Sequence, residues 1–280
     1  MRTKQRCYVV GLGNIGAAIA TRLAKTDVEV VGIDLAADAR AAFEMETGRT
    51  ALSAWSDVTL RRDDRVLLLV RTAEQARDVL LEVRRAGVPV TVFAMTTLDI
   101  EAATAIATID FDTVRVVELP VSGGRSGALE GTLTMMAAGP LTTADREFLL
   151  THLASQVVVF DHYGQPTAAK LHNNLLAAYN ARCHAEILLS GVRNGLDIER
   201  LNKVLTTSSG NSWMGTNLAM IVDDLLEKDV GLFETSFAPL PPMEVGTGSG
   251  LAAALASARA LLEAGASGGG PSGPEGRHGT

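Results

Sequence analysis

The stretch that most restricts the fold of this chain is a glycine-rich turn near its N-terminus. Residues 6 to 10 (RCYVV) predict a buried strand, and the apolar spacing of AAIATRLAK at 17–25 predicts a helix. The turn between them reads Gly11-Leu12-Gly13-Asn14-Ile15-Gly16. In a Rossmann-type fold the first glycine allows a tight turn, the second lets a pyrophosphate approach the backbone and the helix N-terminus, and the third lets helix and strand pack closely. The N-terminus therefore predicts a dinucleotide-binding domain.

An acidic residue follows the turn at the spacing that such a domain requires. A second apolar run, 28–33, ends in Asp34, whose carboxylate would accept hydrogen bonds from the adenosine ribose hydroxyls. The next three residues, at 35–37, offer no cation to a 2′-phosphate. This favours NAD over NADP, and Arg40 is the one nearby residue that could change the preference.

Strands and helices continue to alternate after Asp34. The runs at 65–70 and 89–94 predict buried parallel strands, with helices near 37–46, over 72–86 and from about 98. Ligands of such sheets bind at the carboxyl ends of the strands. Four residues fall there and are predicted to contact the nicotinamide half of the cofactor, with loop packing as the alternative for each: Val70, Arg71, Met95 and Thr97.

A second glycine turn, Ser122-Gly123-Gly124, follows a predicted strand near residue 118. Backbone without side chains can turn its N–H groups towards an anion, and the Ser122 hydroxyl adds a donor. The turn predicts a cradle for a substrate carboxylate, and a flexible glycine loop is the alternative. Residues 132–138 and 156–160 predict two further strands. The first domain is therefore predicted to span residues 1–163.

The chain then predicts one long helix. Pro166 suits a first helical turn, Asn194-Gly195 supplies a stop, and no Gly or Pro interrupts residues 167–190. A helix over 167–194 would be about 40 Å long, enough to span two domains. Lys170 and Asn174 stand on one face, roughly 40° apart, while His172 points about 160° away. A cation and an amide therefore converge, unless Lys170 is simply a surface lysine.

The remainder of the chain predicts an all-α second domain over residues 164–264. Helices are expected at 196–207 with Asp197 as the N-cap, near 216–227, and at 251–264. The last segment, 265–280 (GASGGGPSGPEGRHGT), predicts a disordered glycine-rich tail.

Charge and cysteine content narrow the partners. A net charge of −7 without a Lys/Arg run argues against nucleic acid or an anionic membrane as partner, and no apolar run is long enough to span a bilayer. The two cysteines, Cys7 and Cys183, match neither a disulfide framework nor a metal site, and predict a reduced, cytoplasmic setting. We therefore expect a small-molecule ligand and no metal.

Four separated motifs resemble the β-hydroxyacid dehydrogenase family, within the 6-phosphogluconate dehydrogenase superfamily, whose best-known type is 3-hydroxyisobutyrate dehydrogenase. The motifs are GLGNIG at 11–16, PVSGG running into GALEGTLTMM at 120–136, GQPTAAKLHNN at 164–174 and KDVGL at 228–232. The resemblance covers residues 7–232. It implies a Rossmann-type doubly wound α/β domain joined by the long helix to an all-α domain, and a homodimer or homotetramer.

The resemblance also implies roles for individual residues. Lys170 would be the catalytic residue, Asn174 and the Ser122-Gly123-Gly124 turn would hold the substrate, and Lys228 would line the same cleft. His172 is one position away from a histidine of the 6-phosphogluconate dehydrogenases, so we interpret it as structural or dimer-facing. After Leu232 the family's helical pattern gives way to FETSFAPLPPMEVGTGSG.

The predicted function is NAD-dependent oxidation of the hydroxyl group of a small 3-hydroxy acid, with a lysine as acid and base. Burial and the charge of Lys228 would both lower the pKa of Lys170, which it needs in order to accept a proton near neutral pH. GNSWM at 210–214 resembles L-threonate dehydrogenases, so L-threonate stands beside 3-hydroxyisobutyrate as a candidate. The alternatives are an aldehyde or semialdehyde reductase of the same family and a cofactor-binding protein without turnover.

Overall fold

The computed structural model describes residues 5–107, 113–246 and 249–268, with side chains to residue 262. Within it the chain forms two compact units, Met1–Ala238 and Pro239–Thr280. The predicted division into domains at residues 163 and 264 stays a prediction. Among the described helices, none is long and apolar enough to cross a membrane.

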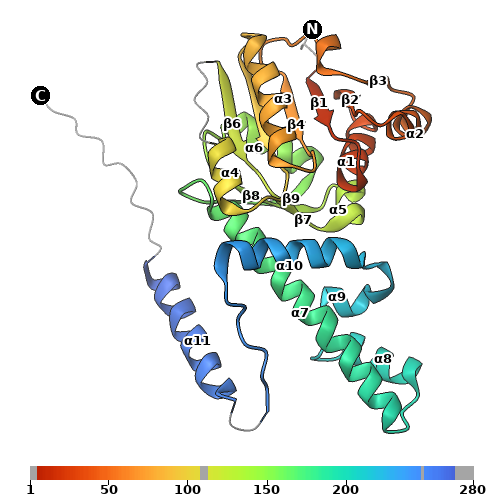
Figure 1. Cartoon of the computed structure of the whole chain (residues 1–280), viewed down its shortest axis with the longest axis vertical. Coiled ribbons are helices and arrows are strands. Elements are labelled where there is room, and N and C mark those ends of the chain that lie inside the picture. Colours follow the sequence, from red (N-terminus) through yellow and green to blue (C-terminus); the bar gives the residue numbers. More distant parts are fainter. Residues whose placement is uncertain (1–4, 108–112, 247–248, 269–280) are drawn as a thin grey trace, which may run out of the picture. The chain divides into compact units, whose positions relative to one another are not determined.

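The first unit is built on a six-stranded parallel sheet in the order β3-β2-β1-β4-β5-β6 (Figure 1). Its strands are β1 (Arg6–Val10), β2 (Glu29–Ile33), β3 (Ala51–Leu52), β4 (Arg65–Leu68), β5 (Val90–Ala94) and β6 (Val114–Glu118). The strand order reverses between β1 and β4. Ligands of open α/β sheets bind at such a switch point, beyond the carboxyl ends of the strands.

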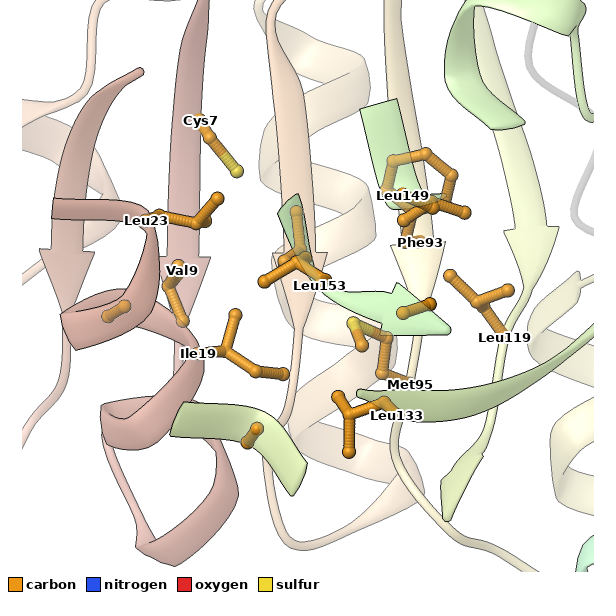
Figure 2. Close-up of a cluster of buried hydrophobic side chains, with 14 of the residues drawn as sticks. Cys7, Val9, Ile19, Leu23, Phe93, Met95, Leu119, Leu133, Leu149 and Leu153 are labelled. Atoms are coloured by element: carbon orange, nitrogen blue, oxygen red, sulfur yellow. The ribbon is translucent and has the colours of Figure 1, made fainter. Parts of the chain in front are cut away.

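Helices cover both faces of this sheet, as the continuous apolar runs predicted. They are α1 (Asn14–Ala24), α2 (Ala37–Thr47), α3 (Ala73–Arg85) and α4 (Ile100–Ala107), with the 3₁₀ turn η1 (Trp55–Asp57) before β4. Alternate residues of β1 enter different cores: Cys7 and Val9 pack with Ile19 of α1, whereas Tyr8 packs with Leu80 of α3. Figure 2 shows the first of these cores.

A three-stranded sheet adjoins the first one. It consists of β7 (Val121–Ser122), β8 (Leu133–Ala137) and β9 (Ala154–Val159), with α5 (Gly124–Glu130) and α6 (Thr143–His152) as connections. The two sheets meet where Glu118 pairs with Ala138. Both strands predicted in this region are confirmed, and β9 begins two residues earlier than predicted. The Ser122-Gly123-Gly124 turn leads from β7 into α5.

The long helix is confirmed as α7 (Gln165–Arg193), 29 residues that span about 44 Å. It is followed by α8 (Ile198–Thr207), α9 (Trp213–Thr216), the 3₁₀ turn η2 (Leu218–Met220) and α10 (Asp223–Phe237). The predicted cap of α8 is also present, since Asp197 accepts a hydrogen bond from the backbone N–H of Arg200 at 2.9 Å. Figure 1 shows α10 lying across α7.

The helix predicted near 216–227 is confirmed only for residues 223–227, and its predicted start is wrong. The Asn217 side chain donates to the carbonyl oxygen of Trp213 at 2.8 Å, which ends α9, because a side chain that satisfies a backbone group competes with helix continuation. A new helix starts only at Asp223, where two acidic residues suit the positive helix end. Lys228 therefore lies inside α10, and the helical pattern continues to Phe237, beyond Leu232.

The second unit contains α11 (Leu251–Gly268). The helix predicted at 251–264 is confirmed, but the prediction of a tail without structure is wrong for residues 265–268, because they continue the alanine-rich helix. The rest of that predicted tail, 269–280, lies outside the described residues.

Candidate active site

The first glycine turn has the geometry that its sequence predicted. A Cβ atom at Gly11, where φ is 94°, would overlap the carbonyl oxygen of Leu69, and one at Gly16 would overlap the carbonyl oxygen of Gly11. The chain itself therefore requires glycine at both positions. At Gly13 a Cβ would meet no atom within 4 Å, so the backbone there faces open space.

Helix α1 starts in this open space without a cap of its own. Gly13 is its N-cap and has no side chain, and no acidic residue lies in the first turn. Arg125 of α5 donates to the carbonyl oxygen of Asn14 at 3.2 Å and so places a cation at the same point. Uncapped N–H groups, the positive helix end and this guanidinium fit the pyrophosphate of a dinucleotide. The sequence analysis gave Arg125 no role. Its one signal there was that a cation directly follows the second glycine turn.

Asp34 lies beside the glycine turn, as predicted. Its carboxylate accepts hydrogen bonds from the backbone N–H groups of Leu12 at 2.7 Å and Ala36 at 2.8 Å. Arg40 donates to the carbonyl oxygens of Asp34 and Leu35, both at 2.8 Å, so its guanidinium holds the backbone of this loop. The carboxylate keeps acceptor capacity for the hydroxyls of a ribose.

The four residues predicted at the strand ends differ in how deeply they are buried. Met95 is 3% exposed and packs in the core beside Leu133, as Figure 2 shows, so it has the packing role that was its alternative. Val70 and Thr97 are half-buried, follow β4 and β5, and stay predicted cofactor contacts. Arg71 is exposed.

Helix α7 brings Lys170 and Asn174 onto one face, where both meet α10. Lys170 is half-buried, and burial lowers its pKa from 10.5 to about 8, while the charge of Asp229 opposes the shift. Our expectation that Lys228 also lowers this pKa is not supported, since Lys228 instead acts on Asp229 and lowers the pKa of that carboxyl. An amine with a pKa of about 8 is partly neutral near neutral pH.

Asp229 belongs to the same cluster, although sequence reasoning gave it no role. The Asn174 side-chain amide, which is 6% exposed, donates to the Asp229 carboxylate at 2.7 Å. Burial raises the pKa of Asp229, and Lys228, Lys170 and the hydrogen bond from Asn174 oppose this shift. The signal was available, because Asp229 stands inside the KDVGL motif.

The second glycine turn lies against α7. Asn173 donates from its side-chain amide to the Ser122 hydroxyl and to the Asn174 side-chain oxygen, both at 3.3 Å. Gly123 and Gly124 have φ values of 127° and 62°, which favour glycine. On the other side, the Lys228 ammonium lies 3.5 Å from the carbonyl oxygen of Thr97. The structure thus gathers the predicted substrate residues around the start of α7, and Asp34 lies apart from them, beside the glycine turn of β1 and α1.

His172 also contacts α10, which lies across α7, although the helical period turns it away from Lys170 and Asn174. Its ring packs edge-on against Phe233 and Phe237 of α10, with centroid separations of 5.0 and 4.7 Å. The residue therefore has a structural contact within the chain. Among the described residues, no group of His, Cys, Asp and Glu is arranged to hold a metal ion.

Comparisons with known proteins agree with this arrangement. Residues 6–163 match the family model of the NAD-binding domain of 6-phosphogluconate dehydrogenase. Residues 164–234 match the model described as the NAD-binding domain of NADP-dependent 3-hydroxyisobutyrate dehydrogenase. The two matched segments adjoin at the start of α7.

Individual relatives point the same way. The chain is 29% identical over 241 residues to an L-threonate dehydrogenase of Cupriavidus necator, covering 80% of each protein. It is 30% identical over 226 residues to a mitochondrial 3-hydroxyisobutyrate dehydrogenase of Bos taurus, covering 76% of this chain and 65% of that one. The crystal structure of 3-hydroxyisobutyrate dehydrogenase from Salmonella typhimurium is similar with a TM-score of 0.69 and 28% identity, over 85% of this chain and 90% of that chain.

Proposed function

The chain belongs to the 3-hydroxyacid dehydrogenase family of NAD(P)-dependent oxidoreductases, and we propose that it oxidises the hydroxyl group of a small 3-hydroxy acid with NAD as acceptor. The observation that carries the proposal is Lys170, a half-buried lysine whose pKa is about 8 and whose neighbour one helical turn on is the buried Asn174. A base must be partly deprotonated at working pH, and few lysines are.

Each side chain of the cluster has one task in this reaction. The neutral Lys170 amine accepts the proton of the substrate hydroxyl, and its ammonium returns a proton to the carbonyl oxygen in the reverse direction. Asn174 orients the oxygen that reacts, while Ser122 and the backbone of Gly123 and Gly124 hold the carboxylate. The bound dinucleotide supplies the hydride acceptor.

Two substrates are supported by the named relatives, 3-hydroxyisobutyrate and L-threonate. The test is NADH formation with a panel of 3-hydroxyisobutyrate, L-threonate, L-serine, D-glycerate and 3-hydroxypropionate. We expect turnover of at least one. Reduction of an aldehyde or semialdehyde with NADPH, without oxidation of any acid of the panel, would identify the family's reductase reaction instead. NADH binding with no turnover in either direction would indicate a cofactor-binding protein.

The cofactor preference depends on Asp34. We predict that Asp34→Ala lowers kcat/KM for NAD by about 10- to 100-fold, because the ribose hydroxyls lose hydrogen bonds to a charged acceptor. The preference of the enzyme for NAD over NADP should become smaller. Kinetics with both cofactors measure this change. Asp38→Ala, which removes an exposed carboxylate in the first turn of α2, is the matched control and should leave the preference unchanged. A wild-type enzyme that prefers NADP would contradict the prediction.

The pH profile depends on Asp229. Because the Asp229 charge raises the pKa of Lys170, Asp229→Asn should lower that pKa below its present value of about 8 and move the acid limb of kcat/KM to lower pH. Asparagine can still accept the hydrogen bond from Asn174. Asp224→Asn, at an exposed position in the first turn of α10, is the control. A shift of the limb to higher pH would show that the two groups do not interact as described.

We also propose that the chain works as a homodimer or homotetramer. Support comes from large apolar side chains of α7 and α8 that are 48–59% exposed: Leu176, Ile187, Leu189, Val192, Ile198 and Val204. Monomeric proteins rarely expose many such residues close together. Light scattering of the purified chain tests the assembly, and a monomeric mass would overturn it.

A further inference from the structure

A buried carboxylate that the proposed reaction does not use connects the start of α7, which carries Lys170, to the chain segment that carries the Ser122-Gly123-Gly124 turn. Glu118, the last residue of β6, is 2% exposed. It accepts three hydrogen bonds from the start of α7: from the N–H of Gly164 at 2.6 Å, from the N–H of Thr167 at 2.9 Å and from the Thr167 hydroxyl at 2.6 Å. Charge-assisted bonds of this length are among the strongest that side chains make.

This carboxylate takes the place of an N-terminal cap for α7. The N-cap residue is Gly164, which has a φ of 87° and no side chain to accept from the first turn. Glu118 supplies both the acceptor oxygens and a negative charge at the positive helix end. The cap therefore comes from a strand of the six-stranded sheet and not from the helix itself.

The position of Glu118 links the lysine to the substrate cradle. Thr167 precedes Lys170 by three residues, which is less than one helical turn or about 4.5 Å along the axis. Glu118 precedes Ser122 by four residues in the same chain segment. A second link, from Asn173 to the Ser122 hydroxyl at 3.3 Å, connects the same two segments further along α7.

We propose that Glu118 is a positioning residue, whose hydrogen bonds to Gly164 and Thr167 set the place of Lys170 relative to the Ser122-Gly123-Gly124 turn. The inference rests on the proposed function insofar as Lys170 is the group that exchanges the proton. A shift of about 1 Å in such a group can lower a rate by about 10²-fold, because proton transfer requires close approach and alignment.

Two variants test this role. In Glu118→Gln the side-chain NH₂ would face the N–H of Gly164, so that hydrogen bond is lost while Thr167 keeps an acceptor. Thr167→Val removes one donor and leaves the backbone bond. We expect kcat to fall by about 10- to 100-fold in Glu118→Gln and by less in Thr167→Val, with the Kd of NADH, measured by fluorescence, unchanged. Glu118→Asp, which keeps the charge, should recover part of the loss.

A second readout does not require turnover. The pKa of Lys170 is followed by its pH-dependent reaction with trinitrobenzenesulfonate, quantified by peptide mass spectrometry. In both variants it should rise from about 8 towards 10.5, because a displaced helix turn admits water to the ammonium. A larger distance between Lys170 and Asp229 would lower this pKa, because the Asp229 charge raises it, so a rise reports hydration of the ammonium.

Thr142→Val is the matched control. It makes the same change at the N-cap of α6, where the Thr142 hydroxyl accepts from the N–H of Asp145 at 3.1 Å. It should lower Tm without changing kcat or the pKa of Lys170. The proposal would be overturned if kcat and the pKa of Lys170 were unchanged in folded Thr167→Val and Glu118→Gln. If Glu118→Gln does not fold, Thr167→Val alone decides the proposal. A raised lysine pKa in a chain that oxidises no 3-hydroxy acid would uphold the positioning and overturn the proposed function.

Discussion

Replacing Lys170 with methionine should lower the kcat of hydroxyacid oxidation by about 10²- to 10⁴-fold, which is the range that a positioned acid or base contributes. Methionine fills the space of the lysine stem but cannot accept a proton. The affinity for NADH should not change, because the groups that fit the pyrophosphate and ribose lie at the glycine turn and Asp34. Steady-state kinetics and NADH fluorescence measure the two quantities separately.

The matched control is Lys203→Met, which makes the same replacement at an exposed position of α8 and should leave kcat unchanged. A Lys170→Met enzyme whose kcat stays within about tenfold of the wild type would show that another group exchanges the proton. Asp229 would then be the next group to test, since burial raises its pKa and Asn174 holds it beside Lys170.

The dinucleotide half of the fold could be predicted because its determinants are local. Strands buried on both faces need continuous apolar runs, and a Cβ atom at Gly16 would overlap the carbonyl oxygen of Gly11, which lies only five residues earlier in the chain. The same applies to the face shared by Lys170 and Asn174, which follows from the helical period alone. These features appear in the structure where the sequence predicts them.

The groups that surround Lys170 could not be predicted in this way. Asp229 lies 55 residues from Asn174, and Glu118 lies 46 residues from Gly164, so only the folded chain brings each pair together. Arg125 reaches Asn14 across 111 residues. The helix error at 216–227 has a similar origin, because the amide of Asn217 competes with the backbone, which apolar spacing does not reveal.

The same Lys170→Met replacement should stabilise the protein near neutral pH. The pKa of Lys170 is about 8 in the folded chain against 10.5 ordinarily, so the unfolded chain binds the proton more tightly. Below pH 8 both states are protonated, and folding carries the full cost of burying the ammonium. Between pH 8 and 10.5 the folded state releases the proton first, so wild-type stability rises with pH over this window. The difference corresponds to about 3–4 kcal/mol, and solvent screening of the half-buried ammonium reduces this to about 2–3 kcal/mol.

The increase in the free energy of unfolding caused by Lys170→Met should therefore depend on pH. We expect Lys170→Met to raise the free energy of unfolding in urea at pH 7 by up to about 2–3 kcal/mol, and to have little effect at pH 10.5, where the wild-type lysine is neutral in the folded state. Lys203→Met, on the exposed face of α8, should change stability at neither pH. An equal effect at both pH values would mean that packing, and not charge burial, separates the two proteins. The two expected results together, lower kcat and higher stability, would show that the lysine is retained for its chemistry, because the fold alone would favour an apolar residue there.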